Sequence, residues 1–246
     1  MSFMGRGSEQ SPHITQFPAT RWSLIVRSSQ RPTADSREAL EILCSNYWYP
    51  LYAFARRQGE KVEDAMDLTQ GFFARLLELQ FLKDFDRERG RFRAFLLAAF
   101  RHHISNERDR QRAQKRGGRN RTFPLDMNDA ERRYHMEPTD SLTPERIYER
   151  RWAMMLIDRA LERLRLASRD SGQFDRLRAF LTGDPPGLSY SALASEMGIS
   201  EGALKVVVHR LRRRFREFVR EEIAETVAGP EEIGEEMRYL LSAVSL

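Results

Sequence analysis

The sequence predicts an all-α protein of two small helical domains, joined by a flexible linker and followed by a C-terminal amphipathic helix. Apolar residues recur at helical spacing through almost the whole chain. Alternating runs of β-branched residues, which would indicate strands, are missing from the sequence. At 246 residues the chain is long enough for two domains that each bury a core.

The first domain is expected over residues 14–116 and contains three helices. Pro50 interrupts the first helix, and Gly59 supplies the turn that ends it. The second helix begins with acidic residues, as the helix dipole favours, and the third ends at a glycine pair. The expected helices run from Ala39 to Phe54, over residues 63–79, and from Phe92 to about Lys115.

Residues 117–143 are predicted to be the linker, because they contain glycines, prolines and many polar residues. The second domain is expected over residues 144–222, where Thr143 is a good N-cap and Pro144 suits the first helical position. Its helices are expected near residues 145–166, 173–182, 189–197 and 201–222.

Residues 223–246 form a C-terminal extension that becomes amphipathic from Pro230 onwards. Its apolar residues at helical spacing are Ile233, Met237, Leu240, Leu241 and Val244. We expect this helix to pack back on the second domain. Binding a regulator and acting as a lid are the alternatives.

Charge favours a polyanionic partner. The formal net charge is +5, and the basic residues are clustered. Residues 101–121 contain eight Lys or Arg against two acidic residues, and residues 205–216 contain six against none. Such clusters attract phosphate groups, although a solvated helix face is the alternative for each cluster alone.

Cellular location follows from what the sequence lacks. Cys44 is the only cysteine, which excludes a disulfide framework and a cysteine-rich zinc site. No window approaches the roughly 18 apolar residues of a membrane helix, and no signal peptide begins the chain. We expect a cytoplasmic protein without membrane contact, in which Cys44 is a buried thiol.

The strongest functional signal is residues 189–211, which have the spacing of a helix-turn-helix. Ala194 is small enough for a second helix to cross close by, and Gly198 makes the turn. Ile199 fills the angle between the helices, and Ser200 caps the second helix. The stripe that faces the core consists of Leu204, Val207, Val208, Leu211 and Phe215.

The opposite face of that second helix indicates DNA binding. Arginine bonds guanine edges and phosphates, and a valine suits the thymine methyl group in the major groove. Val206 is therefore predicted to contact a base, with packing against another part of the protein as the alternative. The outward residues are Lys205, Val206, His209, Arg210, Arg212 and Arg213.

Two helices of the first domain carry the remaining signals. Residues 62–79 have an apolar arc of about half the circumference, bordered by Gln70, which is typical of a buried helix or of one that also docks on a partner. Residues 90–116 place aromatic residues beside arginines, which suits single-stranded DNA as well as a core. In this second helix the inward stripe is Phe92, Phe95, Leu96, Ala99 and His103, and Arg93, Arg101, Arg108 and Arg112 are expected on the far side.

Taken in this order, the three stretches resemble a bacterial RNA polymerase sigma factor of the sigma-70 family, extracytoplasmic-function (ECF) type. The resemblance covers residues 37–222. It rests on Asp64, Asp67, Leu68, Gln70 and Phe73 for the helix called region 2.2, and on FRAFLLAAFRHHISNERDRQR for regions 2.3 and 2.4. The helix-turn-helix is similar to region 4.2.

The resemblance implies a transcription initiation factor that binds core RNA polymerase and directs it to specific promoters. Region 2 would dock on the clamp helices of the largest subunit and would recognise and melt the −10 element. Region 4 would read the −35 element on the flap of the second-largest subunit. An anti-sigma factor or another regulator is a further candidate partner. Val206 and Val207 replace a Ser-Arg pair frequent in the family, so the promoter sequence is not predicted.

The resemblance also assigns residues to each partner. Polymerase would be bound by Asp64, Asp67, Leu68, Gln70, Phe73 and Leu77. The −10 strand would be bound by Phe85, Arg91, Arg93, Arg101, His102, Asn106 and Arg110. The −35 duplex would be bound by Ser200, Lys205, Val206, His209, Arg210 and Arg213.

An enzyme is not expected, nor a cofactor or a metal site. His102 and His103 are adjacent, so they point to different faces of a helix, and no glycine-rich phosphate loop or serine elbow is present in the sequence. The rival is a helix-turn-helix transcriptional regulator whose N-terminal domain dimerises or senses a ligand. A regulator binds duplex DNA alone, whereas a sigma factor of this kind binds it poorly without polymerase.

Overall fold

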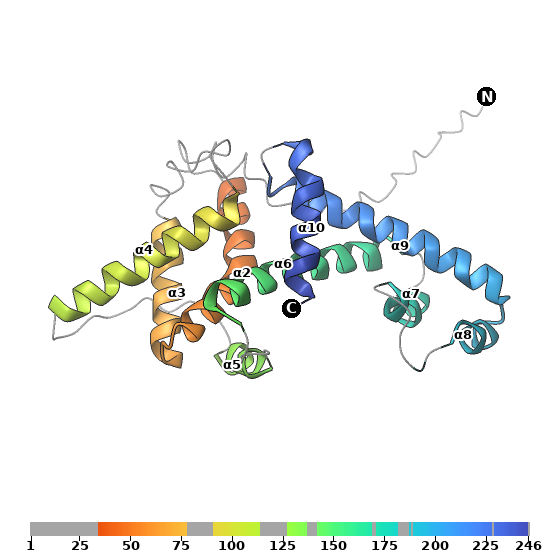
Figure 1. The fold of residues 1–246 in the computed structure, drawn as a ribbon, viewed down its shortest axis with the longest axis horizontal. Coiled ribbons are helices and arrows are strands. Elements are labelled where there is room, and N and C mark those ends of the chain that lie inside the picture. Colours follow the sequence, from red (N-terminus) through yellow and green to blue (C-terminus); the bar gives the residue numbers. More distant parts are fainter. Residues whose placement is uncertain are drawn as a thin grey trace, which may run out of the picture.

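The computed structural model describes residues 34–77, 91–113, 127–136, 142–168, 171–181, 187, 189–227 and 229–245. Every regular element in these residues is helical, which confirms the predicted fold class (Figure 1). None of the described helices could span a membrane. The α-helices are α2 (Ala34–Arg57), α3 (Val62–Leu77), α4 (Phe92–Ala113), α5 (Met127–His135), α6 (Pro144–Leu166), α7 (Ser171–Leu177), α8 (Tyr190–Glu196), α9 (Glu201–Ala224) and α10 (Ile233–Val244), and short 3-10 helices span Arg178–Phe180 and Pro230–Glu232.

Helix α2 continues through Pro50, so the predicted interruption there was wrong. A proline inside a helix costs about 3 kcal/mol. Its neighbours Tyr47, Leu51 and Tyr52 are buried in the core, and burial of large side chains contributes about 1.5 to 3 kcal/mol each. Core packing on both sides of Pro50 therefore offsets the lost hydrogen bond. The turn at Gly59, where φ is +92°, follows as predicted.

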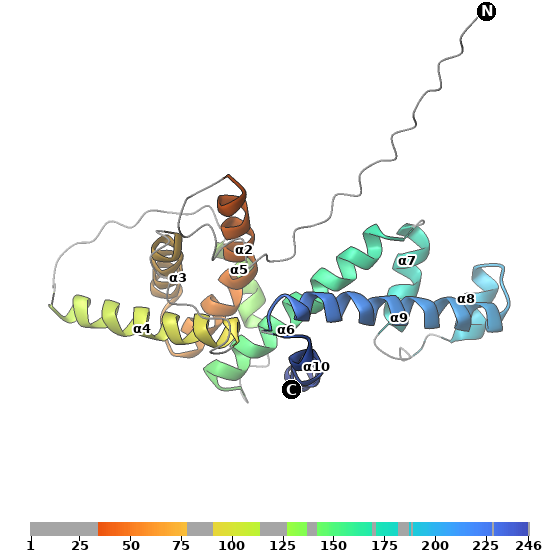
Figure 2. The ribbon, with the colours of Figure 1, turned by 90° about the horizontal axis from the view of Figure 1, so that it is seen from above.

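Helix α6 joins the two ends of the molecule. Figures 1 and 2 show it running from α2 and α5 at one end towards α7 and α9 at the other. Trp152, in the middle of α6, is fully buried, and the core around it includes Tyr47 of α2 and Ile223 of α9. The helix expected to open the second domain thus also packs on the first.

Helix α5 lies inside the range predicted as a linker, and no sequence signal indicated it. Glu131 holds it on α2, because the Arg56 guanidinium donates to both carboxylate oxygens, at 2.7 and 3.1 Å, and the Tyr52 hydroxyl donates to the same group. Arg133 stacks on the Tyr49 ring at 4.0 Å. These contacts join residues more than 70 positions apart, so they are invisible to local patterns.

A second, smaller core holds the helix-turn-helix. It is built from Leu177, Phe180, Leu193, Ala194, Leu204 and Val208 of α7, α8, α9 and the short helix after α7. Helix α10, by contrast, belongs to the large core, where Leu240 and Ala243 are buried. The expected packing of the extension on the second domain is found on both α6 and α9, and α10 also contacts the start of α4.

Candidate nucleic-acid interface

The helix-turn-helix has the local geometry that its sequence predicts. Ser189 accepts a hydrogen bond from the Ala192 amide, at 3.1 Å, and starts α8. Gly198 has φ +67°, a left-handed conformation that glycine adopts without strain. The Ser200 hydroxyl oxygen accepts from the Ala203 amide, at 3.1 Å, and caps α9. Ser200, predicted to bind DNA, therefore first serves to start the helix.

The outer face of α9 is open to solvent along its basic residues. Val206 is 50% exposed, while Leu204 and Val208 on the other face are buried, so the unusual valine does not pack on the protein. The other predicted duplex-binding residues on this face are also exposed: Lys205, His209, Arg210 and Arg213. We call these five residues of α9 the outer face.

Ion pairs on the outer face are local and weak. Lys205 pairs with Glu201 at 2.6 Å and Arg213 with Glu217 at 3.1 Å, each four residues apart on the same exposed helix. Such surface pairs contribute about 0.3 to 0.5 kcal/mol, so a phosphate could replace either carboxylate at little cost. Arg212 differs, because its Nε donates to the Phe180 carbonyl at 2.7 Å and ties α9 to the short helix after α7.

Helix α4 presents a second exposed basic surface. Arg101, His102, Asn106 and Arg110 are all exposed, as their predicted role requires. Arg101 pairs with Glu145 of α6, and Arg110 pairs with Glu107 of its own helix at 2.7 Å. The predicted inward stripe is confirmed, since Phe92, Leu96, Ala99 and His103 are buried and Phe95 is half-buried.

Arg93 does not lie on that exposed side, and the expectation that it shares a face with Arg101 and Arg108 was wrong. Its residue is 6% exposed, and its Nε donates to the Glu236 carboxylate at 2.7 Å. The guanidinium also stacks on Tyr239 at 4.0 Å and on Trp152 at 4.9 Å. The reason is helical spacing: Arg93 is in register with Leu97, Phe100 and Ile104, which are buried.

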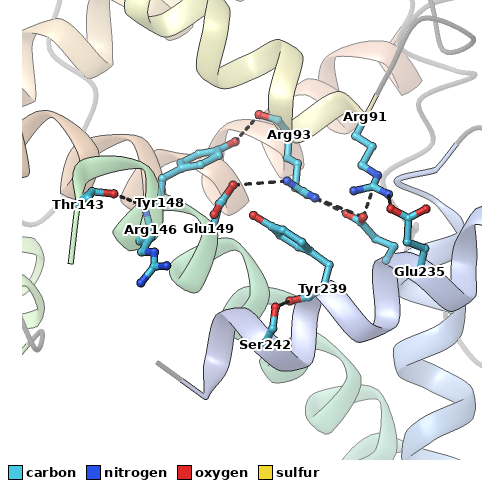
Figure 3. Close-up of polar contacts among 10 residues, drawn as sticks. Arg91, Arg93, Thr143, Arg146, Tyr148, Glu149, Glu235, Tyr239 and Ser242 are labelled. Atoms are coloured by element: carbon cyan, nitrogen blue, oxygen red, sulfur yellow. Dashed lines mark hydrogen bonds and ion pairs between the residues drawn. The ribbon is translucent and has the colours of Figure 1, made fainter. Parts of the chain in front are cut away.

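Carboxylates of α10 surround this start of α4. Figure 3 shows Arg91 and Arg93 pointing towards the first turn of α10. Arg91 donates to Glu235 at 2.8 Å and forms an ion pair with Glu236 at 2.9 Å. Burial by itself lowers the pKa of Arg93, but the hydrogen bonds and charge of Glu236 outweigh it and hold that pKa above its ordinary value. Arg93 therefore stays charged.

A buried histidine marks the contact between α3 and α4. His103 packs on Phe72, and the Arg75 guanidinium lies 3.3 Å from its Nδ1. Since a guanidinium has only donors, Nδ1 accepts, which requires a neutral ring. Burial, and next the positive charge of Arg75, lower the pKa of His103 from 6.5 to about 4.

Helix α3 divides the predicted polymerase-binding residues into two groups. Asp64 and Asp67 are exposed. Leu68, Gln70 and Phe73 are buried, at 7%, 5% and 2% exposure, and pack with the core. The side chain of Leu77 and the whole of Phe85 lie outside the described residues.

Metal chemistry has no candidate in the described part of the chain, where no cluster of three or more His, Cys, Asp or Glu residues could hold an ion.

Comparison with protein-family models gives a match that covers most of the chain. A family model described as ECF sigma factor matches residues 36–223. No curated protein and no solved structure matches the chain.

Proposed function

Because this chain belongs to the ECF sigma factor family, we propose that it recognises promoters with two surfaces, the outer face of α9 and the exposed side of α4. Members of the family are transcription initiation factors that direct RNA polymerase to promoters, and they are not enzymes. Core RNA polymerase and promoter DNA are therefore its partners. The residue-level assignments below are the proposal, as is a cytoplasmic location.

The observation that carries the proposal is the exposed Val206 within a basic helix face. An apolar side chain that stays 50% exposed keeps about half of its surface in water, so a partner that covers it gains the burial of that half. A thymine methyl group in the major groove fits that requirement, and Arg210 beside it suits guanine edges. Helix α9 would read the −35 element in this way, with Lys205 and Arg213 on phosphates.

The exposed side of α4 would meet the −10 element. Arg101 and Arg110 supply positive charge for a DNA backbone, and His102 and Asn106 supply a ring and an amide for bases. Ion pairs with Glu145 and Glu107 hold the arginines only at the surface, where exchange with phosphate is inexpensive. Arg93 is not part of this surface, because Glu236 and two aromatic rings enclose it.

Core polymerase would be bound through α3, on the clamp helices of its largest subunit, while the α7–α9 end would rest on the flap of the second-largest subunit. Asp64 and Asp67 are the exposed residues of α3 in the predicted set. Leu68, Gln70 and Phe73 support this edge from inside. Phe73→Ala is thus a poor probe of polymerase binding, because emptying a buried phenylalanine site costs about 3 to 5 kcal/mol of folding stability.

The test is a pull-down of the full chain with bacterial core polymerase, followed by run-off transcription on a pool of genomic fragments. Stoichiometric binding and discrete new transcripts are expected. Asp67→Ala should weaken core binding, whereas Asp158→Ala, an exposed aspartate on α6, should not. Failure to bind core, with tight binding to duplex DNA by the chain alone, would instead identify a helix-turn-helix regulator.

A further inference from the structure

We infer that α10 competes with nucleic acid for Arg91, so that the C-terminal extension restrains the DNA-binding surface at the start of α4. The inference rests on the proposed function, which assigns the −10 strand to α4. The inference adds the groups that bind Arg91, at the start of α4, in the absence of DNA. These groups are the carboxylates of Glu235 and Glu236.

Arg91 is bound as a phosphate would bind it. Its Nη2 donates to a Glu235 oxygen at 2.8 Å, and its Nε forms an ion pair with a Glu236 oxygen at 2.9 Å (Figure 3). A guanidinium offers these same donors to the oxygens of a DNA phosphate. A phosphate and the carboxylates cannot use the same donors at once, so the two states exclude one another.

The two arginines have different roles in this contact. Arg93 is an anchor, because Glu236 is fully buried and Glu149 of α6 also lies near the guanidinium, at 3.8 Å. Arg91 is the exchangeable partner. Its side chain is 24% exposed, and the Glu235 side chain is 66% exposed. Water and a competing anion can therefore reach the Arg91–Glu235 pair while the rest of α10 stays in place.

The remainder of α10 keeps the competitor near its target. Leu240 and Ala243 are buried in the large core, which holds the helix against α6 and α9. A carboxylate tethered in this way competes at an effective concentration in the millimolar range. Acidic residues also suit the first turn of any helix, but the dipole alone does not explain why Glu236 is fully buried against two arginines.

The test measures binding of the full chain, without polymerase, to a fluorescein-labelled single-stranded DNA of mixed sequence at low ionic strength. Glu235→Gln removes one competing charge from an exposed position and should tighten binding by about two- to fivefold, the value of an exposed ion pair. Glu231→Gln is the matched control, since it makes the same charge change in the exposed segment just before α10. It should have a clearly smaller effect.

A double-mutant cycle separates local competition from general charge. In an Arg91→Gln background the gain from Glu235→Gln should disappear. An unchanged or weaker affinity of Glu235→Gln would overturn the inference, and so would a gain that matches the control or persists without Arg91. Transcription by the wild-type chain with core polymerase tests the proposed function separately. If transcripts appear but Glu235→Gln leaves DNA binding unchanged, only the competition is rejected. If no transcripts appear, the proposed function is rejected.

Discussion

The outer face of α9 and the start of α4 are both rich in arginine, yet the structure treats them in opposite ways. On α9, Arg213 pairs with Glu217, a carboxylate of its own helix, and it stays exposed. At the start of α4, Arg93 is enclosed by carboxylates and rings from two other helices. A basic stretch of sequence therefore does not by itself define a basic surface. Whether the arginines are exposed depends on which other residues pack over them.

The largest expected effect tests this comparison by removing one arginine from the start of α4 and one from the outer face of α9. Arg93→Ala leaves the buried Glu236 with one of its two arginine partners, and disrupting a buried ion pair costs about 3 to 5 kcal/mol. Arg210→Ala, on the exposed face, should change stability by no more than about 0.5 kcal/mol. Urea unfolding of both variants measures the difference. Equal stabilities would mean that Arg93 is not an anchor.

The same contrast explains what the sequence could predict. The helix-turn-helix was predictable because its signals are local: Gly198 makes the turn and Ser200 caps the next helix within a few residues. The burial of Arg93 depends on Glu236, which lies 143 residues further along the chain. Only its helical register with the apolar Leu97 and Phe100 could have indicated it.

Helix α5 and Pro50 show the same limit on sequence-based prediction. The contacts of Glu131 with Arg56 and Tyr52 are formed in the tertiary structure, as is the burial of the aromatic residues around Pro50. Local propensity argued against a helix at Pro50, and no local pattern indicated one at α5; tertiary packing decided both. For the predicted polymerase-binding residues, the sequence located the helix, but the tertiary structure determines that Gln70 and Phe73 face inward.

A second prediction extends the comparison to histidines. His103 is buried with a pKa lowered to about 4, while His209 lies on the exposed outer face. Because the unfolded chain binds this proton near pH 6.5, stability from the neutral ring is complete above that pH. It is lost as the pH falls towards 4, by about 2 to 4 kcal/mol.

Unfolding free energies between pH 7 and pH 4 measure this loss. His103→Gln should flatten the pH dependence in that range, and His209→Gln should leave the wild-type dependence in place. A His103→Gln protein with an undiminished slope would show that other groups cause the acid sensitivity.

A third prediction sharpens the role of the outer face. Arg210→Ala should weaken promoter binding by the polymerase complex by about 1 to 3 kcal/mol, and the loss should depend on sequence. Arg165→Ala is the control, because Arg165 is an exposed arginine of α6 and is not part of the outer face. Fluorescence anisotropy on promoter and scrambled duplexes separates a contact with a base from a contact with a phosphate. Equal losses on both duplexes would reduce Arg210 to a phosphate contact.

The central claim is that this chain reads promoter DNA as a part of RNA polymerase. Its most direct test compares the affinity of one promoter duplex for the free chain and for the chain bound to core polymerase, in the same buffer. The account predicts weak binding by the free chain and tight, sequence-dependent binding by the complex. Tight sequence-specific binding by the free chain, unchanged by polymerase, would contradict it.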